Sequence, residues 1–316
     1  MRFKKAEKAH STHRHSNPEC NCYESVLGLA KPWWKVRGRA LARGPRCISP
    51  TECRLPLKSS FYRPWKPLII CNHRINMESN SSSQIPHIHL LCMDEKFTTA
   101  FKAAKEQYGL PESVNVTYHE GSLSQLESSV KFELVVSPAN SYGRLDGGFD
   151  DAISRAFSPK EDYLALTRMA QAKLYETYRG FMPPGTCIIL PFQFEQPSRN
   201  VWGCKYVALC PTMKLPSIIT WDREIVYECI WSLLCAMDNH NNEARVAKNE
   251  DKMITNILMT PIGTGTGYIS PERWAAQTVI AMRHYIDACN NPEKWSNLHF
   301  LNVMPDCTEV FKTHDI

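Results

Sequence analysis

The chain has 316 residues, of which 43% are hydrophobic, and its net charge at neutral pH is +5. This length fits one large domain or two small ones. The richest apolar stretch, residues 225–237, is shorter than the ~18–20 residues that a helix needs to cross a bilayer, so we expect no membrane span. The basic start is not followed by the apolar core of a secretory signal. We therefore expect an intracellular protein, cytoplasmic or nuclear.

The positive charge is confined to the first part of the chain. Residues 1–76 carry +12 and residues 77–316 carry −7. The basic part shows no sustained periodicity and is punctuated by prolines, so we predict that residues 1–85 form a disordered basic extension. The acidic remainder does not resemble a nucleic-acid binder. We expect nucleic acid to be bound at most weakly and non-specifically, by the basic extension.

The thirteen cysteines are scattered, and most lie inside apolar runs. In a chain of this length without a secretory signal, this distribution predicts reduced, buried thiols. Cys20 and Cys22 have histidines nearby, but their spacing fits no zinc pattern. We expect neither a metal nor a cofactor.

From Pro86 onward, apolar strand-like runs alternate with helical patterns and short connections. We predict strands at residues 87–93, 114–118, 131–137, 186–190, 206–210, 254–260 and 299–303. We predict helices at residues 95–108, 149–157, 163–178, 223–237 and 271–289, with Asp94 and Asp222 as N-caps. Residues 238–251 are polar and are expected to form an exposed loop. Tryptophans 202, 221, 231 and 274 are expected to be core or helix-packing residues.

This alternation predicts a three-layer α/β/α domain over residues 86–304, with a central mixed, largely parallel sheet. Residues 305–316 would follow as a C-terminal tail. In such sheets, ligands bind at the carboxyl ends of the strands, where the connecting loops gather. Two loops of this kind are rich in glycine and polar residues.

The first loop follows the predicted strand at residues 131–137 and reads SPANSYGRLDGGFDD. Its glycines allow close backbone approach and positive φ angles. Asn140 stands just past the strand end, and Asp150 lies in the first turn of the next helix. Exposed N–H groups at a helix N-terminus favour an anionic ligand. A tight turn with no ligand is an equally open interpretation.

The second loop follows the predicted strand at residues 254–260 and reads PIGTGTGYISPERW. Three glycines alternate with threonines directly before a helix, and successive N–H groups in such a loop can form an anion-binding nest. Because no Gly-Lys-Ser/Thr follows, the loop is not a Walker motif. The third glycine of a dinucleotide fingerprint is also missing. Phosphate binding is favoured over a purely structural turn.

Together the two loops resemble the macrodomain family, and in particular a subgroup with the pattern PANS-x-Gly-x-x-Asp-Gly-Gly. Residues 137–140 stand where the family has Asn-Ala-Ala-Asn, and residues 146–150 match its glycine-rich ribose loop. Residues 263–268 match its diphosphate loop. The resemblance covers about 220 residues, and it implies a site for ADP-ribose, free or attached to a protein.

The resemblance also implies roles for individual residues. Asn140 would contact the distal ribose, which Gly147, Gly148 and Phe149 would line. The main-chain N–H groups at Gly263, Thr264, Gly265, Thr266 and Gly267 would hold the diphosphate. Tyr268 would pack near the distal ribose or be an ordinary aromatic residue. At the adenine end, Gly121 and Ser122 stand where the family has a glycine and an aspartate, so the carboxylate that accepts from the adenine amino group is missing.

One further departure from the family and one agreement with it bear on catalysis. Asp146 replaces a glycine in the ribose loop and would repel phosphates unless it meets Arg144 or solvent. Asn140 and Asp150 keep the ten-residue spacing that hydrolases of this fold use to remove ADP-ribose, and Asp150 could orient a water. Alternatively, Asp150 only favours the helix N-terminus. The open functions are an ADP-ribose binder, a mono-ADP-ribosyl hydrolase, and a non-catalytic interaction protein with a degenerate pocket.

Overall fold

The computed structural model describes residues 84–194 and 198–316. The predicted extension therefore lies outside the described residues, except for its last two positions. Six strands are present in this part of the chain: β1 (His87–Cys92), β2 (Val116–Glu120), β3 (Leu134–Ser137), β4 (Ile188–Pro191), β5 (Tyr206–Leu209) and β6 (Asn256–Met259). The α-helices of the same part are α1 (Glu95–Gln107), α2 (Gly148–Phe157), α3 (Ala165–Tyr178), α4 (Ile225–Val246), α5 (Pro271–Asn290), α6 (Pro292–Ser296) and α7 (Phe300–Phe311).

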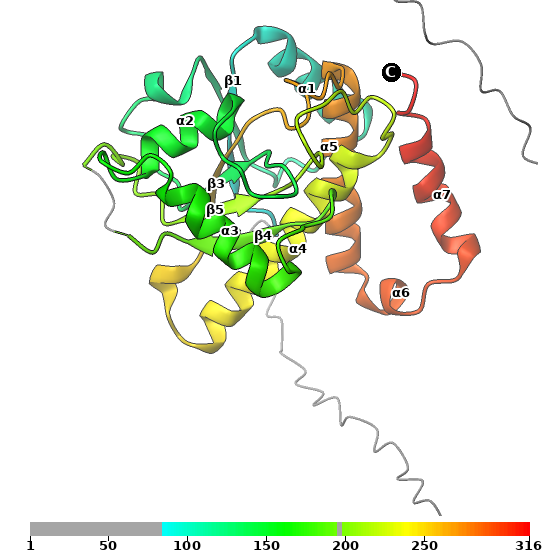
Figure 1. The fold of residues 1–316 in the computed structure, drawn as a ribbon. Coiled ribbons are helices and arrows are strands. Elements are labelled where there is room, and N and C mark those ends of the chain that lie inside the picture. The colour runs from blue at the N-terminus through cyan, green and yellow to red at the C-terminus, as the bar shows by residue number, and fades with distance from the viewer. Residues whose placement is uncertain (1–83, 195–197) are drawn as a thin grey trace, which may run out of the picture. The chain divides into compact units, whose positions relative to one another are not determined.

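The strands form one sheet in the order β2-β1-β6-β3-β5-β4 (Figure 1). Neighbouring strands pair in parallel from β2 to β5, and only β4 runs antiparallel to its neighbour β5. The predicted mixed, largely parallel sheet is confirmed. The register places Leu134 opposite Ile257, so β3 and β6 run side by side and end at the same edge.

Each central strand is buried on both faces, because its side chains alternate between two apolar clusters. Leu134 and Val136 of β3 point into one cluster, with the inner faces of α1, α4 and α5. Val135 points into the other cluster, with α2 and α3. Helices thus cover both faces of the sheet (Figure 1), which confirms the three-layer α/β/α architecture.

Most predicted elements agree with the structure to within a few residues. Asp94 caps α1 as expected, since its side chain accepts a hydrogen bond from the Lys96 N–H at 3.0 Å. Ser270 caps α5 in the same way, and Pro271 occupies the first position of that helix, where its missing N–H costs nothing.

The prediction for residues 222–251 was wrong in two respects. Glu224, not Asp222, is the N-cap of α4. The helix then continues through Val246, whereas residues 238–251 were expected to form a loop. Asn241 and Ala244 are buried at helical spacing after Met237, so the apolar face of α4 extends into the polar segment. The polarity of Asn241 concealed that periodicity.

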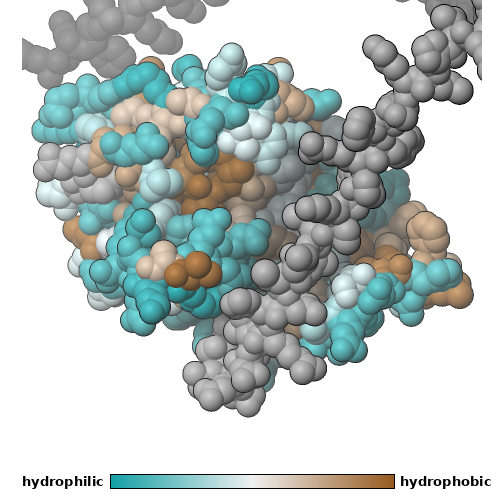
Figure 2. Space-filling view, turned by 90° about the horizontal axis from the view of Figure 1, so that it is seen from below, coloured by the Kyte–Doolittle hydropathy of each residue, from teal (hydrophilic) through white to brown (hydrophobic). Residues whose placement is uncertain are grey.

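The last predicted strand, at residues 299–303, is also wrong. His299 instead caps α7, where its side chain accepts from the Leu301 N–H. Helix α7 reaches Phe311, so residues 305–311 of the predicted C-terminal tail are helical. The predicted domain limits at residues 86 and 304 stay a prediction. Of the residues in α7 only Val310 is buried. Phe300 is 86% exposed, and Figure 2 shows hydrophobic residues on the arm that projects from this part of the molecule.

No helix in residues 84–194 and 198–316 combines the length and apolar character that crossing a membrane would require. All eight described cysteines are free, and Cys210 and Cys229 are buried among apolar side chains as predicted.

Candidate functional site

The two glycine-rich loops lie next to each other at the carboxyl edge of the sheet. One loop follows β3 and the other follows β6, and these strands are parallel neighbours. Parallel neighbours are about 4.8 Å apart, so loops that leave their carboxyl ends start within reach of one molecule. The topology thus brings the two predicted loops together.

The loop after β6 presents a row of free main-chain donors. Among the described residues, none accepts a hydrogen bond from the N–H groups of residues 263–267. The loop is closed from within, since the Ile269 N–H donates to the Gly263 carbonyl at 3.2 Å and the Tyr268 N–H to the Gly265 carbonyl at 3.1 Å. Thr264 donates its hydroxyl to the Pro261 carbonyl, so that hydroxyl is committed within the loop. The free donors are therefore mainly backbone groups, which suit an anion.

Glycine is required at two points of this loop for different reasons. Gly263 has a φ angle of +74°, which disfavours a residue with a Cβ. A Cβ on Gly267 would lie 2.3 Å from the Gly263 carbonyl oxygen. At Gly265, by contrast, an added Cβ would meet no atom within 4 Å, and the residue is exposed. The open, accessible side of the loop is thus at Gly265.

A third segment, which the sequence analysis did not single out, supports this loop. The Ile219 N–H donates to the Gly267 carbonyl at 3.0 Å, and the Ile219 side chain is buried against Gly263 and Gly267. Arg273 of α5 holds the next residue through its contact with the Thr220 carbonyl. The segment between β5 and α4 therefore fixes the glycine loop from behind. The apolar pair Ile218-Ile219 was its only signal in the sequence.

Exposed apolar side chains flank the same loop. Tyr268 is 68% exposed and has a φ of +58°, an uncommon value for a residue with a side chain. Leu215, Ile218 and Trp221 on the supporting segment are exposed as well. The expectation that Trp221 packs in the core is wrong, whereas Trp202 and Trp274 are buried and Trp231 packs against the core as expected.

In the loop after β3, Asn140 organises its own backbone. Its side-chain oxygen accepts from the N–H groups of Tyr142 (3.1 Å) and Arg144 (3.3 Å), and its Nδ2 donates to the Arg144 carbonyl at 2.6 Å. The carboxamide keeps one N–H for another partner. Asn140 thus shapes the loop first, and any contact with a ligand would use the remaining hydrogen.

Asp150 is buried instead of facing the loops. Its carboxyl accepts a hydrogen bond from the Ser137 hydroxyl at 2.7 Å. The pKa of Asp150 is raised to about 7, mainly because burial disfavours the charged carboxylate. The hydrogen bond from Ser137 opposes this rise, and the negative charge of Asp146 adds a smaller contribution to it. The structure therefore does not join Asn140 and Asp150 directly, because each is bonded to other groups.

The remainder of this loop opens toward solvent. Gly147 and Gly148 are exposed, and a Cβ on either residue would meet nothing within 4 Å. Phe149 is half-buried against the second apolar cluster. Asp146 forms an ion pair with Arg144, which is one of the two arrangements that would relieve the repulsion by the additional carboxylate.

Gly121 and Ser122 stand at the end of β2, at the same edge but two strands away from β6. Ser122 begins a short 3-10 helix, Leu123–Gln125. Both its N–H (2.9 Å) and its hydroxyl (2.8 Å) donate to the Gln125 side-chain oxygen. At the position where the resemblance implies a carboxylate, the chain thus has a serine whose donors are satisfied internally.

A histidine cluster lies on β1 and β2. His89 Nδ1 is 3.0 Å from His119 Nε2, and the His87 ring lies 4.5 Å from the His89 ring. Burial, with the charges of the neighbouring histidines, lowers the pKa of His89 to about 4. Within residues 84–194 and 198–316, no three His, Cys, Asp or Glu side chains are arranged to hold a metal ion.

Comparisons with known proteins add little to this geometry. No family model and no curated protein matches the chain. Among solved structures it is similar to an Oceanobacillus iheyensis macrodomain with ADP, with 20% identity over 51% of this chain and 72% of that chain and a TM-score of 0.33. It is also similar to an Oryza sativa APL macrodomain in complex with ADP-ribose, with 13% identity over 42% and 79% and a TM-score of 0.26.

Similarities at these TM-scores do not decide a family. The protein is a three-layer α/β domain whose glycine-rich loops meet at the carboxyl edge of a mixed sheet. The resemblance to macrodomains therefore depends on the sequence motifs and on this geometry.

Proposed function

We propose that this chain is a macrodomain of the PANS-type subgroup and binds ADP-ribose or a related derivative, free or attached to a protein. The observation that carries the proposal is the pairing of two glycine-rich loops on the adjacent parallel strands β3 and β6. Each loop leads into a helix, and the second presents the unpartnered N–H groups of residues 263–267. We predict that the protein lies in the cytoplasm or nucleus and binds an ADP-ribosylated partner protein there.

The diphosphate is the best supported part of the ligand. Backbone N–H groups in a nest bind phosphate oxygens without a cationic side chain. The support from Ile219 and the close fit at Gly267 hold the loop in one conformation before a ligand arrives, which reduces the entropy lost on binding. The ion pair between Arg144 and Asp146 offsets part of the repulsion that an unpaired carboxylate would exert.

The distal ribose would lie along Gly147, Gly148 and Phe149, where the loop is open to solvent. Asn140 would donate its remaining N–H to a ribose hydroxyl. The adenine end lacks a carboxylate at Ser122, so we expect weak discrimination between adenine and other bases.

The geometry supports a binder more than a hydrolase. A catalytic Asp150 would have to leave Ser137 and become exposed before it could orient a water molecule. The hydrolase alternative requires turnover of a mono-ADP-ribosylated protein that is lost in Asp150→Ala. An unchanged rate in that variant would exclude Asp150 from the reaction.

Isothermal titration calorimetry with ADP-ribose, ADP and ribose 5-phosphate tests the proposal. We expect ADP-ribose to bind more tightly than either fragment, because both loops contribute contacts. The absence of heat and of a thermal shift at millimolar ADP-ribose would contradict both the binder and the hydrolase. It would favour the remaining alternative, an interaction protein with a degenerate pocket.

A further inference from the structure

A cavity of about 460 Å³ lies between α4, α6 and the turn before β4. Its walls include Tyr227, Glu228 and Trp231 of α4, Trp295 of α6, and Gly185 of the turn. None of the candidate ADP-ribose residues contributes to it. The cavity is therefore a separate site.

Three aromatic rings form one side of this cavity. Tyr227 and Trp231 are four residues apart on α4, so they share a face of the helix, and their ring centroids are 6.2 Å apart. The Trp295 ring follows at 5.5 Å from Trp231. Three aromatic rings thus lie along this side of the cavity, and the face of an aromatic ring carries negative electrostatic potential.

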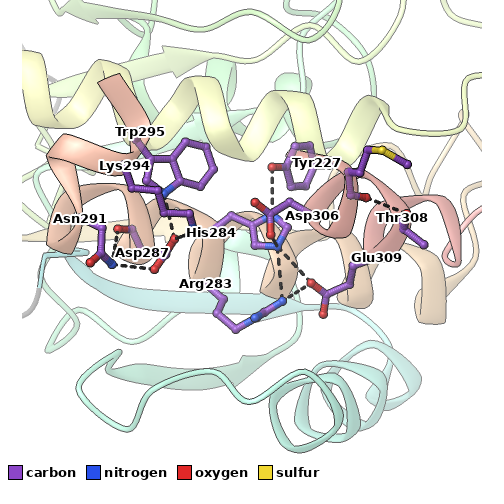
Figure 3. A network of polar contacts seen from close by, with 11 residues as sticks. Tyr227, Arg283, His284, Asp287, Asn291, Lys294, Trp295, Asp306, Thr308 and Glu309 are labelled. Carbon is purple, nitrogen blue, oxygen red and sulfur yellow. Dashed lines mark hydrogen bonds and ion pairs between the residues drawn. The ribbon is translucent and has the colours of Figure 1, made fainter. Parts of the chain in front are cut away.

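The position of Trp295 is fixed by Asp287 of α5, as Figure 3 shows. The indole N–H donates to one oxygen of the Asp287 carboxylate at 2.8 Å, and Asn291 donates to the other at 2.7 Å. Lys294 pairs with the same carboxylate at 2.7 Å and lies 5.5 Å from the Trp295 ring centroid. This ring therefore already engages one ammonium group, while Tyr227 and Trp231 have none over their faces among the described residues.

Glu228 places a negative charge at the cavity, and among the described residues its carboxylate has no hydrogen bond or ion pair. Its pKa is raised by partial burial and by the charges of Asp222 and Glu224. These two charges add to the negative potential at the Glu228 carboxylate. A Cβ on Gly185 would lie 2.5 Å from a Glu228 oxygen, so glycine lets the turn approach the carboxylate closely.

The opposite wall is held in place before any ligand binds. Gly185 donates its N–H to the Pro211 carbonyl at 3.0 Å, and its own carbonyl accepts from the Ser232 hydroxyl at 2.6 Å. Two prolines precede Gly185 and restrict the backbone further. The cavity is thus preformed, which is the usual state of small-ligand sites.

We propose that this cavity binds a methylated ammonium group. Aromatic faces attract a cation whose charge is spread over methyl groups, and the unpaired Glu228 carboxylate adds a direct attraction. An anion would be repelled by Glu228, and a neutral apolar molecule would leave that charge without a partner. An unmethylated ammonium ion is more strongly hydrated, so it would lose more hydration free energy in the cavity than its attraction to the aromatic rings would offset.

The methylated ammonium group can belong to a free quaternary ammonium compound or to a methylated lysine side chain of another protein. Fluorine NMR of the full chain, labelled with fluorotryptophan, distinguishes the two sources. The Trp231 and Trp295 resonances are assigned with the Trp231→Phe and Trp295→Phe variants. The probes are choline, a short peptide with trimethyl-lysine, and the neutral carbon isostere of choline.

We expect choline, the peptide or both to shift the Trp231 and Trp295 resonances, while that of the exposed Trp221 stays in place. Glu228→Gln should weaken binding by about five- to tenfold, and Glu243→Gln, an exposed change on the same helix, should not. Equal binding of the neutral isostere, or no shift with either cation, would overturn the proposal. Among the described residues the Glu228 carboxylate makes no hydrogen bond or ion pair that Glu228→Gln would break, so the variant is expected to fold.

Discussion

The Ser137 hydroxyl donates a hydrogen bond of 2.7 Å to the Asp150 carboxyl, and both residues are buried. Ser137 ends β3, and Asp150 lies in the first turn of α2, so the contact closes the base of the loop between them. A carboxyl buried in this way favours its protonated form, which explains the rise of its pKa to about 7.

This contact makes folding stability depend on pH. Because the pKa of Asp150 is higher in the folded state than its ordinary 3.8, ionisation destabilises the fold as pH rises from about 4 through about 7. A shift of ~3 units sets an upper limit of about 4 kcal/mol. We expect Asp150→Asn, which cannot ionise, to be more stable than the wild type at pH 8 and to lose this advantage near pH 4, as measured by urea unfolding.

Asp151→Asn is the matched control. In the wild type, the Asp151 carboxylate is paired with Arg155 and Tyr163, and these partners lower its pKa. Asp151→Asn should therefore show no gain in folding stability at high pH. Parallel pH profiles for Asp150→Asn and the wild type would show that Asp150 is not a buried acid.

Gly265 and Gly267 should respond differently to substitution. Gly265→Ala should fold and keep affinity for ADP-ribose, because an added Cβ meets open space. Gly265→Glu should also fold but lose at least about tenfold in affinity, because its carboxylate would lie near the diphosphate. Calorimetry measures the affinity, and circular dichroism checks the fold.

Gly267→Ala should instead destabilise the domain, by roughly 1–3 kcal/mol, because its Cβ would lie 2.3 Å from the Gly263 carbonyl oxygen. Thermal unfolding measures the loss. If Gly267→Ala were as stable as Gly265→Ala, the loop conformation described above would be wrong.

Asn241 should contribute strongly to stability although it is polar. Its carboxamide bonds both the N–H and the carbonyl of Ile254, each at 2.8 Å, just before β6. Asn241→Ala would leave both buried backbone groups without a partner, and we expect a loss of about 2–4 kcal/mol. Asn242→Ala, an exposed neighbour on the same helix, should change the urea midpoint little. Similar losses for both variants would contradict this role.

Helix α7 should open before the rest of the domain. It buries only Val310 and is tied to α5 through Glu309, which contacts Arg283 and lies 3.0 Å from His284 (Figure 3). We expect Glu309→Gln to speed amide hydrogen exchange in α7 with little change in α5, and to cost at most about 1 kcal/mol globally. Glu293→Gln, an exposed change on α6, is the control. Unchanged exchange in α7 would show that Glu309 does not hold the helix.

Much of the fold could be predicted because the buried strands and amphipathic helices have clear periods. The apolar run at residues 134–136 lies inside a predicted strand, and the structure buries this strand on both faces. The errors came from polar residues inside helices and from a short apolar run. Asn241 concealed the continuation of α4, and residues 299–303 have a strand-like composition although His299 caps a helix.

For the site, the sequence predicted the two glycine loops but not the contacts between distant segments. The pairing of Ile219 with Gly267 and of Ser137 with Asp150 depends on tertiary packing, which no local pattern records. Asp150 was expected to orient a water molecule or to favour the helix N-terminus, where acidic residues are common. Its burial follows only from the path of the chain.

The central claim is that the N–H groups of residues 263–267 hold the ligand's diphosphate. Nitrogen-15 NMR of the protein titrated with ADP-ribose tests it most directly. The account predicts saturable shifts of these five amide resonances, together with those of Gly147, Gly148 and Phe149, at one common dissociation constant. Saturable binding that leaves the amide resonances of residues 263–267 unchanged would contradict it.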